Sequence, residues 1–142
     1  GLTNQYSFFR YQDGARQREN QGLTPSQITI DDFAKVEQRV GKVVEAANVE
    51  KSDKLIRLVV DFGHFGKRII FTGVRTYGYT PEDFLGKQFL FVVNLEPRKM
   101  LNEYSQGMIL AVDGDELPFG VHGAKKPVFI SAEGVPVGAK IR

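Results

Sequence analysis

The sequence predicts an all-β domain with short helices, in which five strands close into a small barrel. Apolar and polar positions alternate over residues 56–62, as expected for a strand with one buried face. A glycine-bracketed turn at 63–66 then leads into a second strand-like run at 67–72. Further along, two apolar runs at 88–95 and 107–112 flank a polar, basic connection. These observations indicate an antiparallel meander that continues into two more strands.

A short helix is predicted ahead of the first strand. Residues 31–36 place two acidic side chains in a first helical turn after Thr29, which is a suitable N-cap. Phe33 and Val36 are three residues apart, so they can face inward together.

The first strand is expected to be long and bent. Residues 37–45 are strand-like, and Gly41 interrupts their alternation, which predicts a bulge at the glycine. A bent first strand is a feature of small closed barrels.

A second short helix is expected at 80–86, because Pro81 and two acids begin it and a glycine ends it. A helix between the third and fourth strands is the layout of an OB-fold.

One domain is expected over residues 28–142, preceded by an N-terminal extension at 1–27. The extension is rich in Gln, Asn and Arg and lacks sustained periodicity, so it is expected to be partly ordered at best. Its aromatic residues could dock on the domain or on a second subunit. Residues 126–130 and 135–141 are too short and Pro-broken for a second domain and are expected to form a C-terminal β appendage.

The composition is that of a globular protein, with 42% apolar and 25% charged residues. Nineteen basic residues exceed 17 acidic ones by only two, so any nucleic-acid site must be a local patch. The absence of cysteine excludes disulfides, thiolate chemistry and Cys-based zinc sites. No apolar run approaches the ~20 residues of a membrane helix. We therefore expect a cytoplasmic protein with no membrane partner.

Catalysis is not expected. The two histidines, His64 and His122, each lie in a glycine-rich turn without a carboxylate or second histidine at ligand spacing. The sequence has no P-loop and no dinucleotide-binding fingerprint. It therefore predicts neither a metal site nor a cofactor.

A first candidate binding segment is residues 63–80. It contains Lys67, Arg68 and Arg75, four aromatic residues and no acid. Cations that contact phosphates beside rings that stack on bases are typical of RNA-binding OB surfaces. The equally weighted alternative is that the rings pack in the core or in a loop and that the cations are solvated.

A second candidate segment follows the fourth strand. Asn94 ends the strand, where an amide can order a turn or bind a ligand, and a proline stiffens the loop that carries Arg98 and Lys99. Met100 could lie under a base or sugar, or it could plug the mouth of the barrel. Two glutamates, at 96 and 103, offset the local positive charge, which argues against a purely electrostatic site.

The motifs VNLEPRKM (93–100) and SQGMIL (105–110) resemble the tRNA-binding domain that is fused to bacterial methionyl-tRNA synthetases and also occurs as a stand-alone protein. Shorter supporting segments are DFAKV (32–36), RVGK (39–42), SDKL (52–55), TGVR (72–75) and LGK (85–87). The resemblance covers residues 28–142. It implies an OB-fold that binds tRNA by shape and backbone contacts, as a homodimer, without catalysis. An aminoacyl-tRNA synthetase is a further possible partner.

Carried onto this sequence, the resemblance implies five RNA contacts, with three further residues in support. The five are Asn94, Arg98, Lys99, Met100 and Ser105, and the three are Arg39, Lys42 and Lys54. Arg75, from the basic and aromatic segment at 63–80, completes the predicted set. Many family members have Glu where this chain has Gln106. A related branch, the CsaA-type chaperones, has the same fold and is associated with unfolded export polypeptides, which provides an alternative function.

Overall fold

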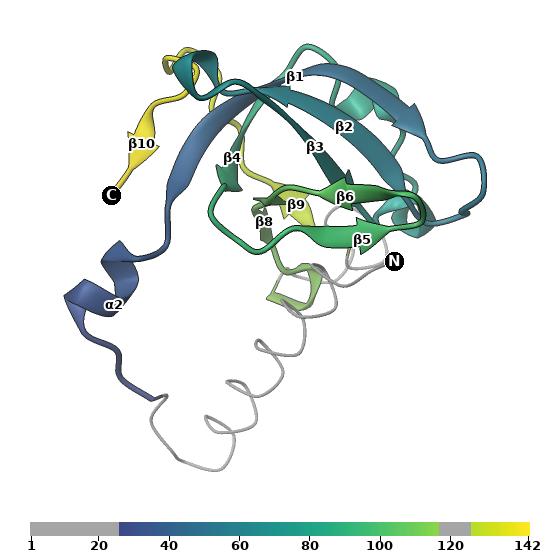
Figure 1. The fold of residues 1–142 in the computed structure, drawn as a ribbon. Helices are drawn as coiled ribbons and strands as arrows, with labels where there is room; N and C mark the ends of the chain where they lie inside the picture. Colours follow the sequence, from purple (N-terminus) through teal and green to yellow (C-terminus); the bar gives the residue numbers. More distant parts are fainter. Residues whose placement is uncertain (1–25, 117–125) are drawn as a thin grey trace.

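The computed structural model describes residues 26–116 and 126–142 of the chain (Figure 1). The extension predicted at 1–27 therefore lies almost entirely outside the described residues, as does His122. In the described part of the chain, no helix is long and apolar enough to cross a membrane.

Five antiparallel strands form the main path of the central sheet, in the order β3-β2-β1-β4-β7. Their bounds are β1 (Gln38–Asn48), β2 (Ile56–Asp61), β3 (Lys67–Thr72), β4 (Gln88–Val92) and β7 (Met108–Ile109). β1 is long enough to pair with both β2 and β4, and the sheet curls until it is nearly closed (Figure 1). The predicted five-stranded, OB-like barrel is confirmed.

The bulge in β1 does not occur at Gly41. The register between β1 and β2 shifts between Val43 and Glu45, whereas Gly41 pairs regularly with Phe89 of β4. A Cβ atom at Gly41 would lie 2.5–2.9 Å from three core side chains, those of Val60, Phe62 and Phe91. The predicted position of the bulge is therefore wrong, because this glycine serves close packing across the barrel.

The barrel interior is filled by the apolar faces of the strands. Ile56, Leu58, Val60 and Phe62 are all buried, which confirms the alternation predicted for β2. They pack in a cluster with Val43, Ile70, Val74, Phe84, Phe89, Phe91, Val93 and Ile109. A second, smaller cluster contains Leu55, Phe71 and Met100.

The connection between β4 and β7 is itself a hairpin, although the sequence predicted a polar loop. It consists of β5 (Arg98–Met100) and β6 (Glu103–Ser105), which form a two-stranded sheet with each other. β6 lies beside β3, so the hairpin crosses one side of the barrel (Figure 1). We call residues 98–105 the β5–β6 hairpin.

Short helices complete the connections. The 3₁₀ turns are η1 (Gly63–Phe65), η2 (Arg75–Tyr77), η3 (Pro81–Asp83) and η4 (Gly114–Glu116). η3 occupies the position predicted for a helix between the third and fourth barrel strands, and Thr80 and Asp83 form a capping box at its start.

The helix α2 (Ile30–Ala34) begins at the predicted cap, where Thr29 and Asp32 form a capping box. It stands away from the barrel (Figure 1). Phe33 and Val36 are each 41% exposed, so the prediction that they face inward together is wrong. A five-residue helix that projects from the barrel has no core surface on which to bury them.

The C-terminal residues form the predicted β appendage. β8 (Ala111–Val112) pairs with β9 (Val128–Phe129), and β10 (Lys140–Ile141) pairs with the start of β1. Phe129 packs edge-on against Phe84 and Phe89 of the core, with ring centroids 5.1 and 6.2 Å apart. The appendage is thus anchored to the barrel interior.

Candidate functional site

The β5–β6 hairpin has one buried and one exposed face. Its cross-strand pairs are Arg98 with Ser105, Lys99 with Tyr104, and Met100 with Glu103. Because side chains alternate along a strand, Met100 and Ser105 point inward, where they are 2% and 1% exposed. Lys99 and Tyr104 point outward and are exposed. Arg98, at the open end of the hairpin, is exposed as well.

Ser105 and the residue after it fasten the hairpin to β3. The Ser105 Oγ accepts a hydrogen bond from the backbone N–H of Phe71 at 3.1 Å. The Gln106 Oε1 accepts one from the backbone N–H of Ile69 at 3.0 Å, and the Gln106 N–H donates to the Ile69 carbonyl at 2.8 Å. We call this set of bonds the clasp. The clasp provides side-chain oxygen acceptors for two backbone N–H groups of β3. A Glu at position 106 could accept the same hydrogen bond as Gln106.

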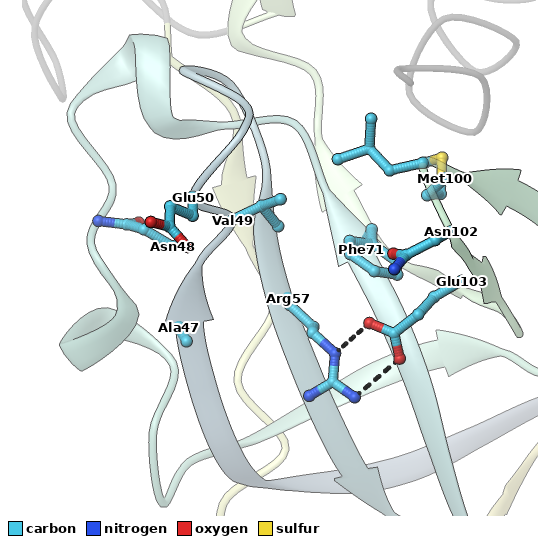
Figure 2. Close-up of a pocket in the computed structure, with 10 residues that line it drawn as sticks. Ala47, Asn48, Val49, Glu50, Arg57, Phe71, Met100, Asn102 and Glu103 are labelled. Atoms are coloured by element: carbon cyan, nitrogen blue, oxygen red, sulfur yellow. Dashed lines mark hydrogen bonds and ion pairs between the residues drawn. The ribbon is translucent and has the colours of Figure 1, made fainter.

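An ion pair fastens the tip of the hairpin to β2. The Arg57 Nε and Nη2 atoms donate to the two Glu103 carboxylate oxygens at 2.8 and 2.9 Å (Figure 2). These hydrogen bonds raise the pKa of Arg57 and lower the pKa of Glu103. Glu103 was expected to offset the charge of the loop, but its carboxylate is paired with Arg57. It therefore subtracts less from the field of Arg98 and Lys99.

A groove separates the hairpin tip from the loop between β1 and β2. Its deeper part, about 210 Å³, has Arg57, Phe71 and Met100 among its lining residues (Figure 2). A neighbouring hollow of about 470 Å³ is lined by Val49, Glu50, Lys51, Leu101 and Asn102. The groove is thus bounded by the first interstrand loop on one side and by the connection between the last two barrel strands on the other.

The loop at 49–55 is held in a defined shape. The Ser52 Oγ accepts hydrogen bonds from the backbone N–H groups of Lys54 and Leu55, at 3.1 and 3.2 Å. The Arg75 side chain donates to the carbonyls of Val49, at 3.5 Å, and Ser52. Arg75, predicted as an RNA contact, therefore braces this wall of the groove, while the side chain of Lys54 on the same loop is exposed.

Two other predicted contacts meet around Glu37, at the start of β1. The Asn94 Oδ1 accepts from the Glu37 N–H at 2.8 Å, and its Nδ2 donates to the Lys35 carbonyl at 2.5 Å. Arg39 donates to the Glu37 carboxylate at 3.2 Å and to the Gly138 carbonyl at 2.9 Å. These side chains hold the strand ends together. Lys42, further along β1, is exposed.

The aromatic residues of 63–80 have mostly structural environments. Phe71 is buried beneath the hairpin, and the Arg39 guanidinium lies 3.7 Å from the centroid of the Phe65 ring. Tyr79 packs against Phe84 and Phe129, and its hydroxyl donates to the Pro127 carbonyl at 2.5 Å. For Phe71 and Tyr79, the alternative of core or loop packing therefore describes their environment.

Sequence reasoning did not single out Tyr104 or Arg57. Tyr104 lies in a three-residue strand, which is too short to show a period. Once the hairpin is known, Tyr104 directly follows Glu103, the cross-strand partner of Met100, so its side chain lies on the face opposite to that of Met100. Arg57 meets Glu103 across 46 residues, a separation at which single-sequence patterns carry no signal. Among residues 26–116 and 126–142, no group of three or more His, Cys, Asp or Glu side chains could hold a metal ion.

Comparison with known proteins identifies the family. Residues 38–140 match the family described as "Putative tRNA binding domain". The methionine–tRNA ligase of Stenotrophomonas maltophilia is 47% identical over 102 residues, which cover 71% of this chain and 15% of that protein. The ligase of Halalkalibacterium halodurans is also 47% identical, over 92 residues and 14% of its length. The chain thus spans about one seventh of the length of these relatives.

Solved structures give the same result. A MetRS-related protein from Pyrococcus horikoshii superposes with a TM-score of 0.72 at 37% identity, covering 83% of this chain and 100% of that one. The chaperone CsaA from Bacillus anthracis superposes with a TM-score of 0.66 at 28% identity, covering 82% and 100%. The strand order, the length of the matched segment and these relatives together show that the chain belongs to the tRNA-binding domain family.

Proposed function

We propose that this chain binds tRNA, without catalysis, on the face formed by the β5–β6 hairpin and the 49–55 loop. The observation that carries the proposal is the position of Arg98 and Lys99, exposed on a hairpin that borders the groove. OB-folds bind oligonucleotides between the loop that joins their first two strands and the loop that joins their last two. The 49–55 loop and the hairpin are those two connections in this barrel.

The charges on this face suit local contacts rather than long-range attraction. A net charge of +2 gives a weak overall field, but Lys51 lines the groove and Lys54 is exposed on the same loop. Arg98 and Lys99 are exposed on the hairpin that borders the groove on its other side. Such cations contact phosphates and fix the register of the RNA, while shape supplies the selectivity. Lys42 is a supporting contact on β1.

The remaining predicted contacts act through the position of this face. Met100 and Ser105 are buried beneath the hairpin, so they hold its backbone in place. Asn94 and Arg39 fix the end of β4 to the start of β1, and Arg75 braces the 49–55 loop. In the proposal these five side chains position the exposed cations.

A titration of labelled total tRNA at two salt concentrations tests the site. The wild-type chain should bind at micromolar concentration or tighter, and more weakly as salt rises. Replacing Arg98 and Lys99 together by Ala should weaken binding and reduce the slope of log K against log salt by about 1.4–1.8, the loss of two phosphate contacts.

The matched control removes two exposed cations elsewhere, Lys87 and Lys140. Lys87 precedes β4, at the end opposite the hairpin, and Lys140 lies on β10. This control should keep more of the wild-type affinity than the hairpin variant. Equal affinities of the two double variants would rule out the hairpin as the site, and no binding by the wild-type chain would rule out the function.

We also propose a homodimer in the cytoplasm, with α2 at the interface. Ile28, Ile30, Phe33 and Val36 expose apolar side chains on and beside this helix, and burial against a second copy would remove them from water. Analytical ultracentrifugation should find a dimer for the wild-type chain and a monomer after Ile30→Asp and Phe33→Asp. A wild-type monomer would refute the dimer. Because the chain matches part of methionine–tRNA ligases, we also propose an aminoacyl-tRNA synthetase as a partner.

Binding of unfolded polypeptide is a second candidate, favoured by the same exposed apolar residues and by the structural likeness to CsaA. A labelled, chemically unfolded polypeptide should then bind the wild-type chain and lose affinity in the Ile30→Asp and Phe33→Asp variant. If polypeptide binds and tRNA does not, this candidate replaces the first.

A further inference from the structure

The outward face of the β5–β6 hairpin carries an aromatic ring that the phosphate contacts do not use. Tyr104 is 55% exposed and pairs directly across the hairpin with Lys99. Within residues 26–116 and 126–142, neither its ring nor its hydroxyl has a bonding partner. An exposed ring beside a cation is the arrangement with which single-stranded nucleic acids are bound.

The other exposed aromatic residues are less suited to this role. Phe65 is 53% exposed, but the Arg39 guanidinium covers one face of its ring at 3.7 Å. Tyr77 is less exposed than Tyr104 and lies on η2, outside the hairpin. Among the described aromatic residues, Tyr104 is the most exposed, and it adjoins the candidate phosphate contacts.

The backbone on both sides of Tyr104 is held in place by contacts of its neighbours. The preceding residue, Glu103, is held by the two hydrogen bonds from Arg57, and the following residue, Ser105, is buried in the clasp. The backbone of Tyr104 is therefore fixed on both sides, and only its two side-chain torsions are free. A ring held in this way loses little conformational entropy when a base stacks on it.

We propose that Tyr104 stacks on an unpaired nucleobase of the bound tRNA while Lys99 contacts a neighbouring phosphate. The inference rests on the proposed tRNA binding and specifies which part of the RNA lies on the hairpin. Bases inside a duplex are covered on both faces, so the base must come from a loop or an end. Stacking depends on the ring and not on base identity, which suits a protein that recognises tRNA by shape.

A single tryptophan reports on this contact directly. The chain has no Trp, so Tyr104→Trp introduces the sole indole, and Tyr77→Trp gives a matched control on η2. Titration with total tRNA should quench the fluorescence at position 104 more strongly than at position 77. Equal or absent quenching at 104, in a variant that still binds tRNA, would overturn the inference.

Affinity measurements separate stacking from charge and from folding. Tyr104→Val keeps the β propensity of the strand but removes the ring, so it should weaken tRNA binding by about 5- to 150-fold with an unchanged salt slope. Tyr104→Phe keeps the ring and should stay within about twofold of wild type. Lys99→Ala should instead reduce the salt slope by about 0.7–0.9.

The outcomes also separate this inference from the function on which it rests. If the wild-type chain binds tRNA and Tyr104→Val binds equally well, stacking is wrong and the proposed function stands. If Tyr104→Phe loses as much as Tyr104→Val, the hydroxyl and not the ring makes the contact, which also overturns stacking. Denaturant unfolding of each variant confirms that the comparison is made between folded proteins. If the wild-type chain binds no tRNA, both proposals fail.

Discussion

Replacing Ser105 by Ala distinguishes a clasp from an RNA contact. The Ser105 side chain is 1% exposed, and its Oγ is the acceptor for the Phe71 N–H at 3.1 Å. Alanine leaves that N–H unpaired in a buried position, because water cannot reach it. An unsatisfied buried donor costs about 1–3 kcal/mol. Each kcal/mol lowers the melting temperature of a domain of about 100 residues by about 4–8 °C.

Urea unfolding followed by circular dichroism measures this loss. The free energy of unfolding should fall by about 1–3 kcal/mol with an unchanged m-value. Ser131→Ala is the matched control, because the Ser131 Oγ also accepts a backbone hydrogen bond, from Glu133 at 3.3 Å, but is exposed. Water can replace that bond, so the control should stay within about 0.5 kcal/mol of wild type.

The opposite result would refute the clasp. If Ser105→Ala is as stable as Ser131→Ala, the bond to the Phe71 N–H does not hold the hairpin. If Ser105→Ala keeps that stability and nevertheless binds tRNA more weakly, Ser105 is a direct contact, as the family resemblance implied.

Three further predictions concern the stability of the barrel and of the hairpin. Gly41→Ala should lower the free energy of unfolding by about 1–3 kcal/mol or more, because the added methyl would lie 2.5 Å from a Val60 carbon; denaturant unfolding measures it. The hydrogen bonds from Arg57 lower the Glu103 pKa, so this pair stabilises the fold above the unfolded-state pKa of about 4.3, and its contribution is lost as pH falls through the folded-state value. Glu103→Gln should therefore be less stable than wild type at pH 7, by at most about 1 kcal/mol for a pair this exposed, and the difference should shrink below pH 4 in parallel melts. Leu101 has a φ of 63°, so Leu101→Asn should match or exceed wild-type stability by up to about 1 kcal/mol in urea, and a clear loss would show that this residue is not strained.

The barrel strands were predictable because each has a period and a length that local sequence reveals. β2 alternates over its whole length, and the glycine-rich turn after it fixes where β3 begins. Burial of one face is decided within a few residues, so the core positions of β2 follow from the same pattern. η3 was predictable for a similar reason, because its proline and its capping residues are adjacent in the chain.

The hairpin was not predictable, because its structure depends on contacts with distant strands. Three-residue strands show no period, and the partners of Ser105 and Glu103 are 34 and 46 residues away. The prediction that the apolar face of α2 is buried was wrong for a related reason. The spacing of Phe33 and Val36 indicates an apolar face but does not say whether the barrel lies against it. For the site, sequence therefore indicated the cations of the hairpin and missed what orients them.

The orientation of the hairpin bears directly on how a chain with a net charge of only +2 could hold a polyanion. Ordering one flexible residue on binding costs about 1–2 kcal/mol of backbone entropy. If the eight-residue hairpin became ordered only on the RNA, this cost would exceed the free energy gained from two phosphate contacts. The clasp and the Arg57–Glu103 pair fix that backbone during folding instead. In the proposed site, Arg98, Lys99 and Tyr104 are then presented at constant spacing, so few contacts would suffice. Loosening the hairpin should for this reason weaken binding without changing the salt slope, whereas removing its cations should change both.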